Sequence, residues 1–177
     1  MPVMTLGVVL AAGAGSRYGS PKALAENWLQ RAVSALAAGG VGEVLVALGA
    51  ADVPVPRPAT PLWVPDWADG LSATVAAAIH AAQSKPGVEA LLLHTVDTPD
   101  VGPAVIERVL RSNAAGLTRA VYRGRPGHPV VVGRAHWHAL LDELSGDVGA
   151  GPFLEAHPDL VRVECSDLAS GVDIDAR

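Results

Sequence analysis

The chain has 177 residues and a formal net charge of -5, enough length for one domain with a buried core but too little positive charge for a general nucleic-acid binder. No segment has the roughly 20 consecutive apolar residues of a membrane-spanning helix, and the first residues lack the basic leader of a secretory signal. Cys165 is the only cysteine, which excludes an internal disulfide and a cysteine-based zinc cage. We therefore expect a cytoplasmic protein with neither nucleic acid nor membrane as a partner.

Apolar β-type runs alternate with helical segments along the chain, the pattern of an α/β protein whose mostly parallel sheet is covered on both faces. We expect one domain over residues 1–177, a three-layer α/β/α sandwich with Rossmann-like topology. The predicted strands are Leu6–Ala11, Glu43–Gly49, Leu62–Val64, Glu89–Asp97, Arg119–Tyr122, Val130–Val132 and Leu160–Cys165. The predicted helices are Lys22–Gly40, Leu71–Gln83, Val101–Ser112 and Ala135–Leu144.

The stretch LAAGAGSRYGSPK follows the first predicted strand and leads into the first predicted helix. A glycine-rich turn of this kind presents unpaired backbone N–H groups at the positive end of a helix dipole, which favours phosphate. Gly13, Gly15 and Gly19 allow a close approach of the backbone to a ligand. Arg17 and Lys22 supply positive charge beside it. The alternative is that the glycines only shape a tight turn and that the two cations are solvated.

Two familiar phosphate-binding loops do not fit this stretch. A P-loop needs a glycine followed by lysine, and no glycine of this chain precedes a lysine. The dinucleotide fingerprint GxGxxG is replaced by GxGxxxG, and the second strand ends in Leu48, Gly49 and Ala50 instead of an acidic residue that would hold a ribose. Hydride chemistry with NAD(P) therefore stays only as an alternative.

The same stretch resembles the signature LAAGxGxRxGxPK of the nucleotidyltransferases that activate sugars, alcohols and cofactors, which implies their Rossmann-like fold. The matching positions are Leu10, Ala11, Ala12, Gly13, Gly15, Arg17, Gly19, Pro21 and Lys22. The resemblance implies that this loop, Ala14 included, wraps the triphosphate of a nucleotide. It also implies catalytic roles for Arg17 and Lys22, which would stabilise charge as pyrophosphate leaves. Phosphoryl transfer relies on such positioning and electrostatic relief.

Departing pyrophosphate normally travels with Mg²⁺, so carboxylates are expected at strand ends that face the loop. Asp97 directly follows a buried strand, where a carboxylate either binds a cation, pairs with a cation or caps a helix. Asp100 is the better candidate for the helix cap. VDTP resembles the family motif that supplies the first magnesium ligand, which makes Asp97 also a catalytic candidate. GVDIDAR resembles the start of DIDTPEDL, which implies Asp173 as the second ligand and Asp175 as a helper; a frayed acidic tail is the alternative.

Three further stretches resemble the molybdenum cofactor cytidylyltransferases and their relatives. DWADGLSATVAAAI resembles WxxGMxxS and adds four candidate nucleotide-binding residues, Asp69, Gly70, Ser72 and Thr74. They either present N–H groups and a hydroxyl to the nucleotide or only begin a helix.

The other two stretches carry candidate acceptor-binding residues. His128 lies in GHPVVV, which resembles GxPVLF, and Asp147 lies in GDVGAG, which resembles GDxGAR with Gly151 in place of the arginine. Each could instead serve only its turn.

The sequence thus predicts an enzyme that transfers a nucleoside monophosphate from a nucleoside triphosphate to a phosphate-bearing acceptor. By resemblance the donor is CTP, with GTP close behind, the acceptor is a molybdopterin-type cofactor, the metal is Mg²⁺, and the expected protein partner is a molybdoenzyme. A non-catalytic carrier of nucleotide or cofactor is the rival from another class. An NAD(P)-dependent oxidoreductase is the third option.

Overall fold

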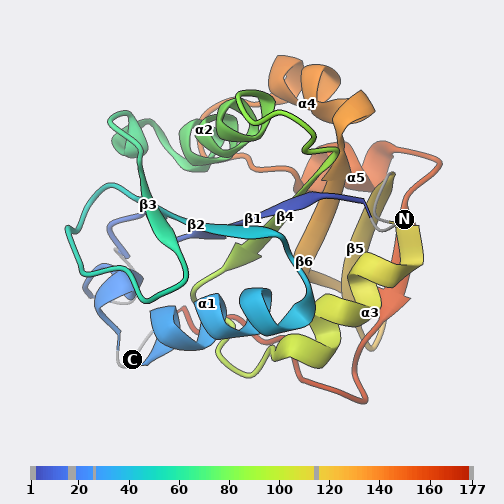
Figure 1. The fold of residues 1–177 in the computed structure, drawn as a ribbon, viewed down its shortest axis with the longest axis horizontal. Coiled ribbons are helices and arrows are strands. Elements are labelled where there is room, and N and C mark those ends of the chain that lie inside the picture. The colour runs from blue at the N-terminus through green and yellow to red at the C-terminus, as the bar shows by residue number, and fades with distance from the viewer. Residues whose placement is uncertain (1–2, 16–18, 26, 114–115, 176–177) are drawn as a thin grey trace.

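The computed structural model describes residues 3–15, 19–25, 27–113 and 116–175. In this part of the chain the strands form one sheet, and helices cover both of its faces (Figure 1). The strands are β1 (Thr5–Leu10), β2 (Glu43–Leu48), β3 (Thr60–Trp63), β4 (Ala90–Thr95), β5 (Leu117–Tyr122), β6 (Arg125–Gly133) and β7 (Val161–Glu164). The helices are α1 (Trp28–Gly39), α2 (Leu71–Gln83), α3 (Pro103–Asn113), α4 (Trp137–Glu143) and α5 (Gly151–Ala156), with the short 3₁₀ turns η1 (Lys22–Leu24), η2 (Trp67–Asp69) and η3 (Arg134–His136). The predicted three-layer α/β sandwich is confirmed.

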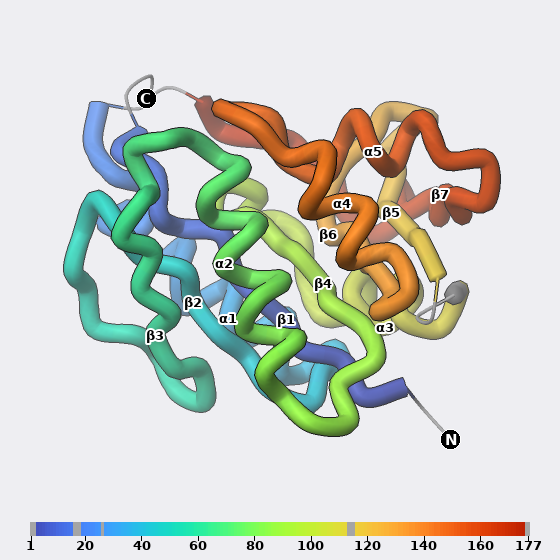
Figure 2. The backbone as a smooth tube through the Cα atoms, turned by 90° about the horizontal axis from the view of Figure 1, so that it is seen from above, coloured from blue at the N-terminus to red at the C-terminus, as the bar shows by residue number. Residues whose placement is uncertain are grey.

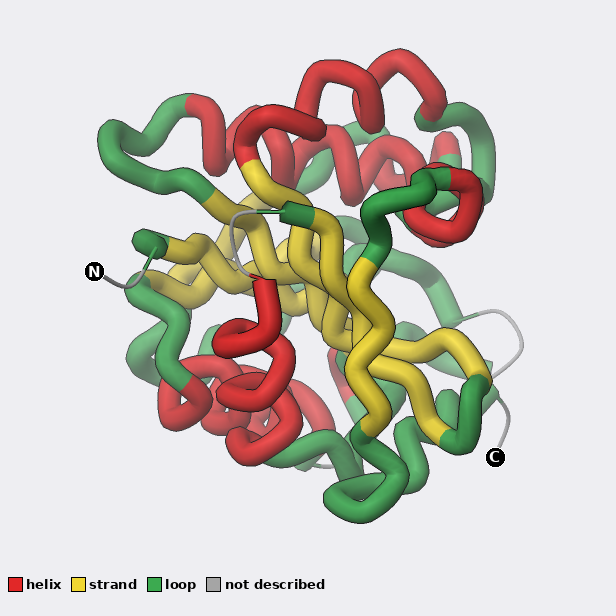
Figure 3. Tube along the Cα trace, turned by 90° about the vertical axis from the view of Figure 1, so that its right-hand side faces the viewer, coloured by secondary structure: helices red, strands yellow, loops and turns green. Residues whose placement is uncertain are grey.

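The strand order is β3-β2-β1-β4-β6-β5-β7. β1 pairs in parallel with both β2 and β4, and β5 pairs in parallel with β7. β6 lies between β4 and β5 and runs antiparallel to both, so one strand of the sheet is reversed. Figure 2 shows the strands crossing the molecule beneath α2 and α4, and Figure 3 shows the same sheet from its side between two layers of helix.

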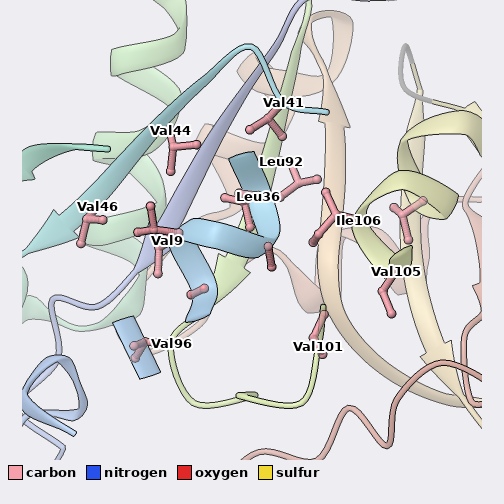
Figure 4. Close-up of a cluster of buried hydrophobic side chains, with 14 of the residues drawn as sticks. Val9, Leu36, Val41, Val44, Val46, Leu92, Val96, Val101, Val105 and Ile106 are labelled. Atoms are coloured by element: carbon pink, nitrogen blue, oxygen red, sulfur yellow. The ribbon is translucent and has the colours of Figure 1, made fainter. Parts of the chain in front are cut away.

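The sheet separates two apolar cores. One lies under α1 and α3, where Leu36 and Ile106 meet Val9 and Leu92 of the central strands (Figure 4). The other lies under α2, α4 and α5, with Trp137 fully buried in it. β1 faces both cores and is buried along its whole length, which is the expected state of a central parallel strand. Each fully buried aliphatic side chain stabilises the fold by about 1.5–3 kcal/mol.

Helix α2 matches the predicted range, and its buried positions explain why. Thr74, Val75, Ala78, Ile79 and Ala82 recur every three or four residues and form the face that packs on the sheet. Alanine supplies high helix propensity along the rest of the segment. The start of α2 therefore sits where the sequence placed it, at the edge of the sheet that holds the site described below.

Three elements differ from the prediction. The first predicted helix is split, because η1 ends at Leu24 and α1 begins only after Asn27, whose φ of 59° interrupts a regular helix. β6 has 9 residues, whereas only Val130–Val132 were predicted. The prediction was too short because the first residues of the strand are half-buried or exposed and so lack an apolar pattern. α5 was not predicted. It has 6 residues and opens with Gly151 and a proline, so it is too short to show helical periodicity.

In the ranges that the structure describes, every helix is too short or too polar to cross a bilayer.

Candidate active site

A cavity of about 480 Å³ opens at the edge of the sheet where β1 and β4 end. Parallel strands place the residues that follow them at a common edge, so the loops after β1 and β4 meet there. The lining residues are Leu10, Ala11, Ala12, Gly13, Ala14, Gly15, Lys22, Trp67, Ala68, Gly70, Leu71, Thr74, Thr95, Val96, Asp97 and Asp147. Most of the predicted nucleotide-binding residues thus share one cavity.

The glycine loop forms one wall of this cavity. Gly15 has a φ of 64°, and a Cβ atom there would collide with the carbonyl of Ser20, so the turn requires glycine. Within the described chain, the backbone N–H groups of Gly13, Ala14 and Gly15 donate no hydrogen bond. Free amides in a cavity wall are donors for an anionic ligand. Arg17, predicted to act in catalysis, lies outside the described residues.

Lys22 and Asp97 come together at one end of the cavity. Lys22 Nζ lies 2.7 Å from Asp97 Oδ2, and the two side chains are only 17% and 18% exposed. Lys22 begins η1 directly after the glycine loop, whereas Asp97 follows β4, so the two neighbouring strands β1 and β4 bring them into contact. The pairing joins two of the three predicted catalytic residues.

The C-terminal segment reaches the same end of the cavity. Ile174 N donates to the backbone oxygen of Asp97 at 3.0 Å, and Lys22 Nζ lies 3.5 Å from Asp175 Oδ1. Burial raises the pKa of Asp173, and the nearby carboxylates of Asp97 and Asp175 raise it further. The second predicted metal ligand therefore lies next to the first. Residues 170–175, called the C-terminal strap below, pack against the site and do not form a frayed tail.

Asp100 anchors this strap. Its Oδ2 accepts hydrogen bonds from Ser170 N at 2.7 Å and from the Ser170 hydroxyl. The expectation that Asp100 caps the following helix is wrong, because α3 begins at Pro103 and the carboxylate is occupied by Ser170 instead. Gly171 packs against the ring of Tyr122 beside this anchor.

The carboxylates fit a divalent cation in part. Asp97 Oδ1 is buried and has no hydrogen-bond partner among the described residues, which is costly unless a ligand satisfies it. Among the residues that the structure describes, no three His, Cys, Asp or Glu side chains are arranged to hold a metal ion. Asp97 and Asp173 would thus supply two ligands, which suits Mg²⁺, since this ion usually takes one or two carboxylates and completes its shell with water and substrate phosphate.

The turn before α2 forms the opposite wall. Gly70 and Thr74 line the cavity as predicted, whereas Asp69 and Ser72 do not. Ser72 N donates to the carbonyl of Gly146 at 3.1 Å, which ties this turn to the loop after α4. Asp147 belongs to that loop. Its Oδ1 accepts from Leu71 N at 3.2 Å, so this carboxylate caps α2 and also faces the cavity.

His128 does not line the cavity, although it lies near Asp97. Burial and the neighbouring Arg119 lower its pKa to about 4, while the charge of Asp97 acts in the opposite direction. Its carbonyl accepts a hydrogen bond of 2.6 Å from the Tyr122 hydroxyl. His128 is therefore neutral at pH 7, and because it lies outside the cavity lining, the structure gives the predicted contact with an acceptor no direct support.

Several cavity residues were not predicted. Trp67, Ala68 and Leu71 belong to the turn before α2, and the motif DWADGL that contains them was the available signal. Thr95 and Val96 immediately precede Asp97 and could have been inferred from that neighbourhood.

His94 is a further buried residue near the site. It is fully buried, neither ring nitrogen has a hydrogen-bond partner in the ranges that the structure describes, and burial lowers its pKa to about 3. Nothing in the strand sequence ALLLHT distinguishes it from a histidine that is paired.

Residues 7–161 match the family described as MobA-like NTP transferase domain. A curated relative, nicotine blue oxidoreductase of Paenarthrobacter nicotinovorans, is 34% identical over 194 residues, which covers 99% of this chain and 93% of that protein.

Among solved structures, the Rv0371c homologue from Mycobacterium sp. strain JC1 superposes with a TM-score of 0.79 at 25% identity, covering 99% of this chain and 92% of that one. A nucleotidyl transferase from Methanothermobacter thermautotroptrophicus gives a TM-score of 0.73 at 23% identity, covering 98% of this chain and 92% of that one. The latter likeness concerns the fold alone. Because the family match spans most of the chain and includes the glycine loop, Lys22 and Asp97, the protein belongs to the MobA-like NTP transferase domain family.

Proposed function

We propose that the protein transfers a nucleoside monophosphate from a nucleoside triphosphate to a small phosphate-bearing acceptor and releases pyrophosphate. CTP is the favoured donor, because the loop reads LAAG as in the cytidylyltransferases that it resembles. A molybdopterin-type cofactor is the favoured acceptor on the same ground. Membership in a nucleotidyltransferase family supports the general reaction class.

The observation that carries this proposal is the contact between Lys22 and Asp97 at the end of the glycine-loop cavity. Free amides, an ammonium group and a carboxylate with one unsatisfied oxygen meet within one cavity. The amides and the ammonium suit the phosphates of a nucleotide, and the carboxylate suits the cation that accompanies them.

The reaction needs no nucleophile from the protein. The acceptor phosphate oxygen attacks the α-phosphorus in line, a new P–O bond forms, and the bond to pyrophosphate breaks. The glycine loop holds the triphosphate, and Lys22 neutralises charge on the oxygens of the leaving pyrophosphate. Mg²⁺, held by Asp97 and Asp173, would add Lewis-acid neutralisation of the same oxygens.

The direct test is pyrophosphate release by the purified protein with CTP, GTP, ATP or UTP, Mg²⁺ and molybdopterin as acceptor. We expect release with CTP in excess of that with the other three, and an increase in melting temperature on binding of the preferred nucleotide. Nucleotide binding without release for any acceptor would favour the non-catalytic carrier instead.

The identity to nicotine blue oxidoreductase favours a second candidate, an oxidoreductase that uses the same cavity. One observation speaks against a dinucleotide of the usual kind. At the end of β2, where an acidic residue would hold a ribose, Gly49 packs against the ring of Trp67 and leaves no room for a side chain. Oxidation of NADH or NADPH with a quinone-type acceptor, in the absence of any pyrophosphate release, would establish this candidate.

A further inference from the structure

Lys22 uses one oxygen of Asp97 and leaves the other unused. Nζ lies 2.7 Å from Oδ2, whereas Oδ1 is buried and has no partner in the part of the chain that is described. A carboxylate that accepts from a single ammonium is incompletely satisfied, since each oxygen has capacity for two hydrogen bonds. Asp97 therefore holds Lys22 and remains a ligand for another cation.

The ammonium serves more than one carboxylate. Lys22 also lies 3.5 Å from Asp175, next to Ile174, whose backbone N donates to the carbonyl of Asp97. Two carboxylates thus share one ammonium. The remaining negative charge is what a divalent cation would neutralise.

The ammonium and the cation cannot both occupy this place at low cost. A magnesium ion that starts on the unused Asp97 Oδ1 shares one carboxylate with the ammonium, and an ion that takes both oxygens, at about 2.1 Å from each, would sit within about 5 Å of Nζ. Two positive charges so close, on side chains mostly shielded from water, repel strongly. Lys22 has to move before the metal is bound well.

Nucleotide phosphate offers Lys22 another partner. The lysine follows the glycine loop, and the loop amides that line the same cavity have no partner in the described chain. A flexible four-carbon stem lets the ammonium shift from a carboxylate to a nearby phosphate.

We propose that Lys22 and the divalent cation compete for Asp97, and that the nucleotide relieves the competition by drawing Lys22 onto its phosphates. Metal alone binds weakly, and metal and nucleotide load together. This inference rests on the proposed function, in which Asp97 and Asp173 hold the metal.

The first test measures Mn²⁺ binding without nucleotide, by electron paramagnetic resonance. Lys22→Met keeps the length of the stem and removes the charge, and we expect it to bind Mn²⁺ at least about fivefold more tightly than the unaltered protein. Lys85 is the only other lysine and pairs with Glu43 at 2.9 Å, so Lys85→Met is the matched control and should change nothing. Adding Asp97→Asn to Lys22→Met should abolish the gain.

A second measurement uses the unaltered protein, which guards against a Lys22 variant that folds poorly. With ¹³C-labelled lysine the two side chains give two Cε signals. Saturating Mg²⁺ should shift the Lys22 signal and leave that of Lys85 in place.

Two results would overturn the competition. One is an affinity of Lys22→Met for Mn²⁺ that is equal to or below that of the unaltered protein, including no binding by either. The other is a Lys22 signal that Mg²⁺ leaves unchanged. Neither measurement involves turnover, so a failure to release pyrophosphate would count against the proposed function and not against this inference.

Discussion

Lys22 and Asp97 are separated by 75 residues in the chain and by 2.7 Å in space. The Asp97 carboxylate has two successive tasks, to hold the ammonium before the nucleotide binds and to hold the cation in the proposed reaction. Asp175, with a side chain 61% exposed and 3.5 Å from Lys22, can contribute only weakly to the first. The two aspartates should therefore differ sharply in effect.

We predict that Asp97→Asn lowers the rate of pyrophosphate release by about a hundredfold or more, because a neutral amide does not neutralise the cation that accompanies the phosphates. Asp175→Asn should lower it less than about fivefold. Rates of pyrophosphate release, compared with melting curves that show both variants folded, are the measurement. Equal rates for Asp97→Asn and the unaltered protein would rule out the assigned role.

His94 gives the protein a predictable dependence of stability on pH. Its pKa is about 3 in the folded state because of burial, against about 6.5 when unfolded. As pH falls below about 6.5 the unfolded chain takes up the proton first, so stability is full above that value and is lost as pH falls toward 3. The slope is up to about 1.4 kcal/mol per pH unit for one such group. His128, with a pKa lowered to about 4, adds in the same direction.

His94→Leu should remove the contribution of one titrating group to the dependence of stability on pH. Urea unfolding at about pH 7 and at about pH 5 measures the free energy of unfolding of both proteins, and the difference between the two pH values should be smaller for the variant. An unchanged difference would mean that His94 titrates alike in both states.

At the scale of single residues, the sequence predicted the site residues that belong to a recognisable motif. Lys22, Asp97 and the loop residues stand in a local pattern, and the cavity contains residues 10–15, Lys22 and Asp97. Whether the His94 ring finds a hydrogen-bond partner among the described residues depends on which side chains surround it in three dimensions, so no local sequence pattern reveals it. For the same reason the sequence did not show that His128 lies outside the cavity lining.

Among the elements, the turn before α2 and the loop after α4 act as one wall. Gly70 adopts a φ of 111°, and a Cβ atom there would lie 2.8 Å from Asp147 Oδ1 and closer still to the carbonyl of Gly146. The glycine thus allows the close contact that also includes the hydrogen bond from Leu71 N to Asp147.

We predict that Gly70→Ala destabilises the fold by about 1–3 kcal/mol, since it combines backbone strain with a collision against Gly146. Gly102→Ala is the matched control, because the space around that glycine is open and its φ is not positive. Urea unfolding of both variants checks the difference. Similar stabilities would show that the two segments separate without cost.

The C-terminal strap is the second element with a functional consequence. Asp100→Ala removes the acceptor for Ser170 N and its hydroxyl, so residues 170–175 should exchange their amide hydrogens faster, while β1 and β4 keep their protection. Mn²⁺ affinity should fall as Asp173 loses its fixed position. Unaltered exchange in the strap would show that Ile174 alone holds it.

The elements that the sequence missed are short or interrupted. α5 has too few turns to show an apolar stripe. The break at Asn27 comes from a left-handed backbone conformation, which asparagine can adopt but which the residue type alone does not predict. By contrast, α2 and β4 were predicted closely, because burial on one face or on both leaves a clear apolar pattern.

For the molecule as a whole, one sheet lies between two apolar cores. Cys165 belongs to the core under α1 and α3, so its reactivity measures whether that core is intact. The thiol is fully buried after β7, and burial raises its pKa. We predict that an aromatic disulfide reagent does not label the native protein, and that labelling in urea follows the loss of helix measured by circular dichroism. Labelling that precedes this loss would show that β7 detaches from the sheet before the rest unfolds.

The reversed strand β6 affects how this architecture can diversify. The hairpin between β5 and β6 turns at Arg123 and Gly124, whose backbone N–H groups donate hydrogen bonds to the carboxylate of Glu164 in β7. β6 begins directly after this turn and contains His128. Surface turns of this kind tolerate insertions better than the strands that they connect. The residues that line the cavity come from the segments after β1 and β4, around the start of α2 and after α4, so evolution can lengthen the turn between β5 and β6 without rebuilding the cavity wall.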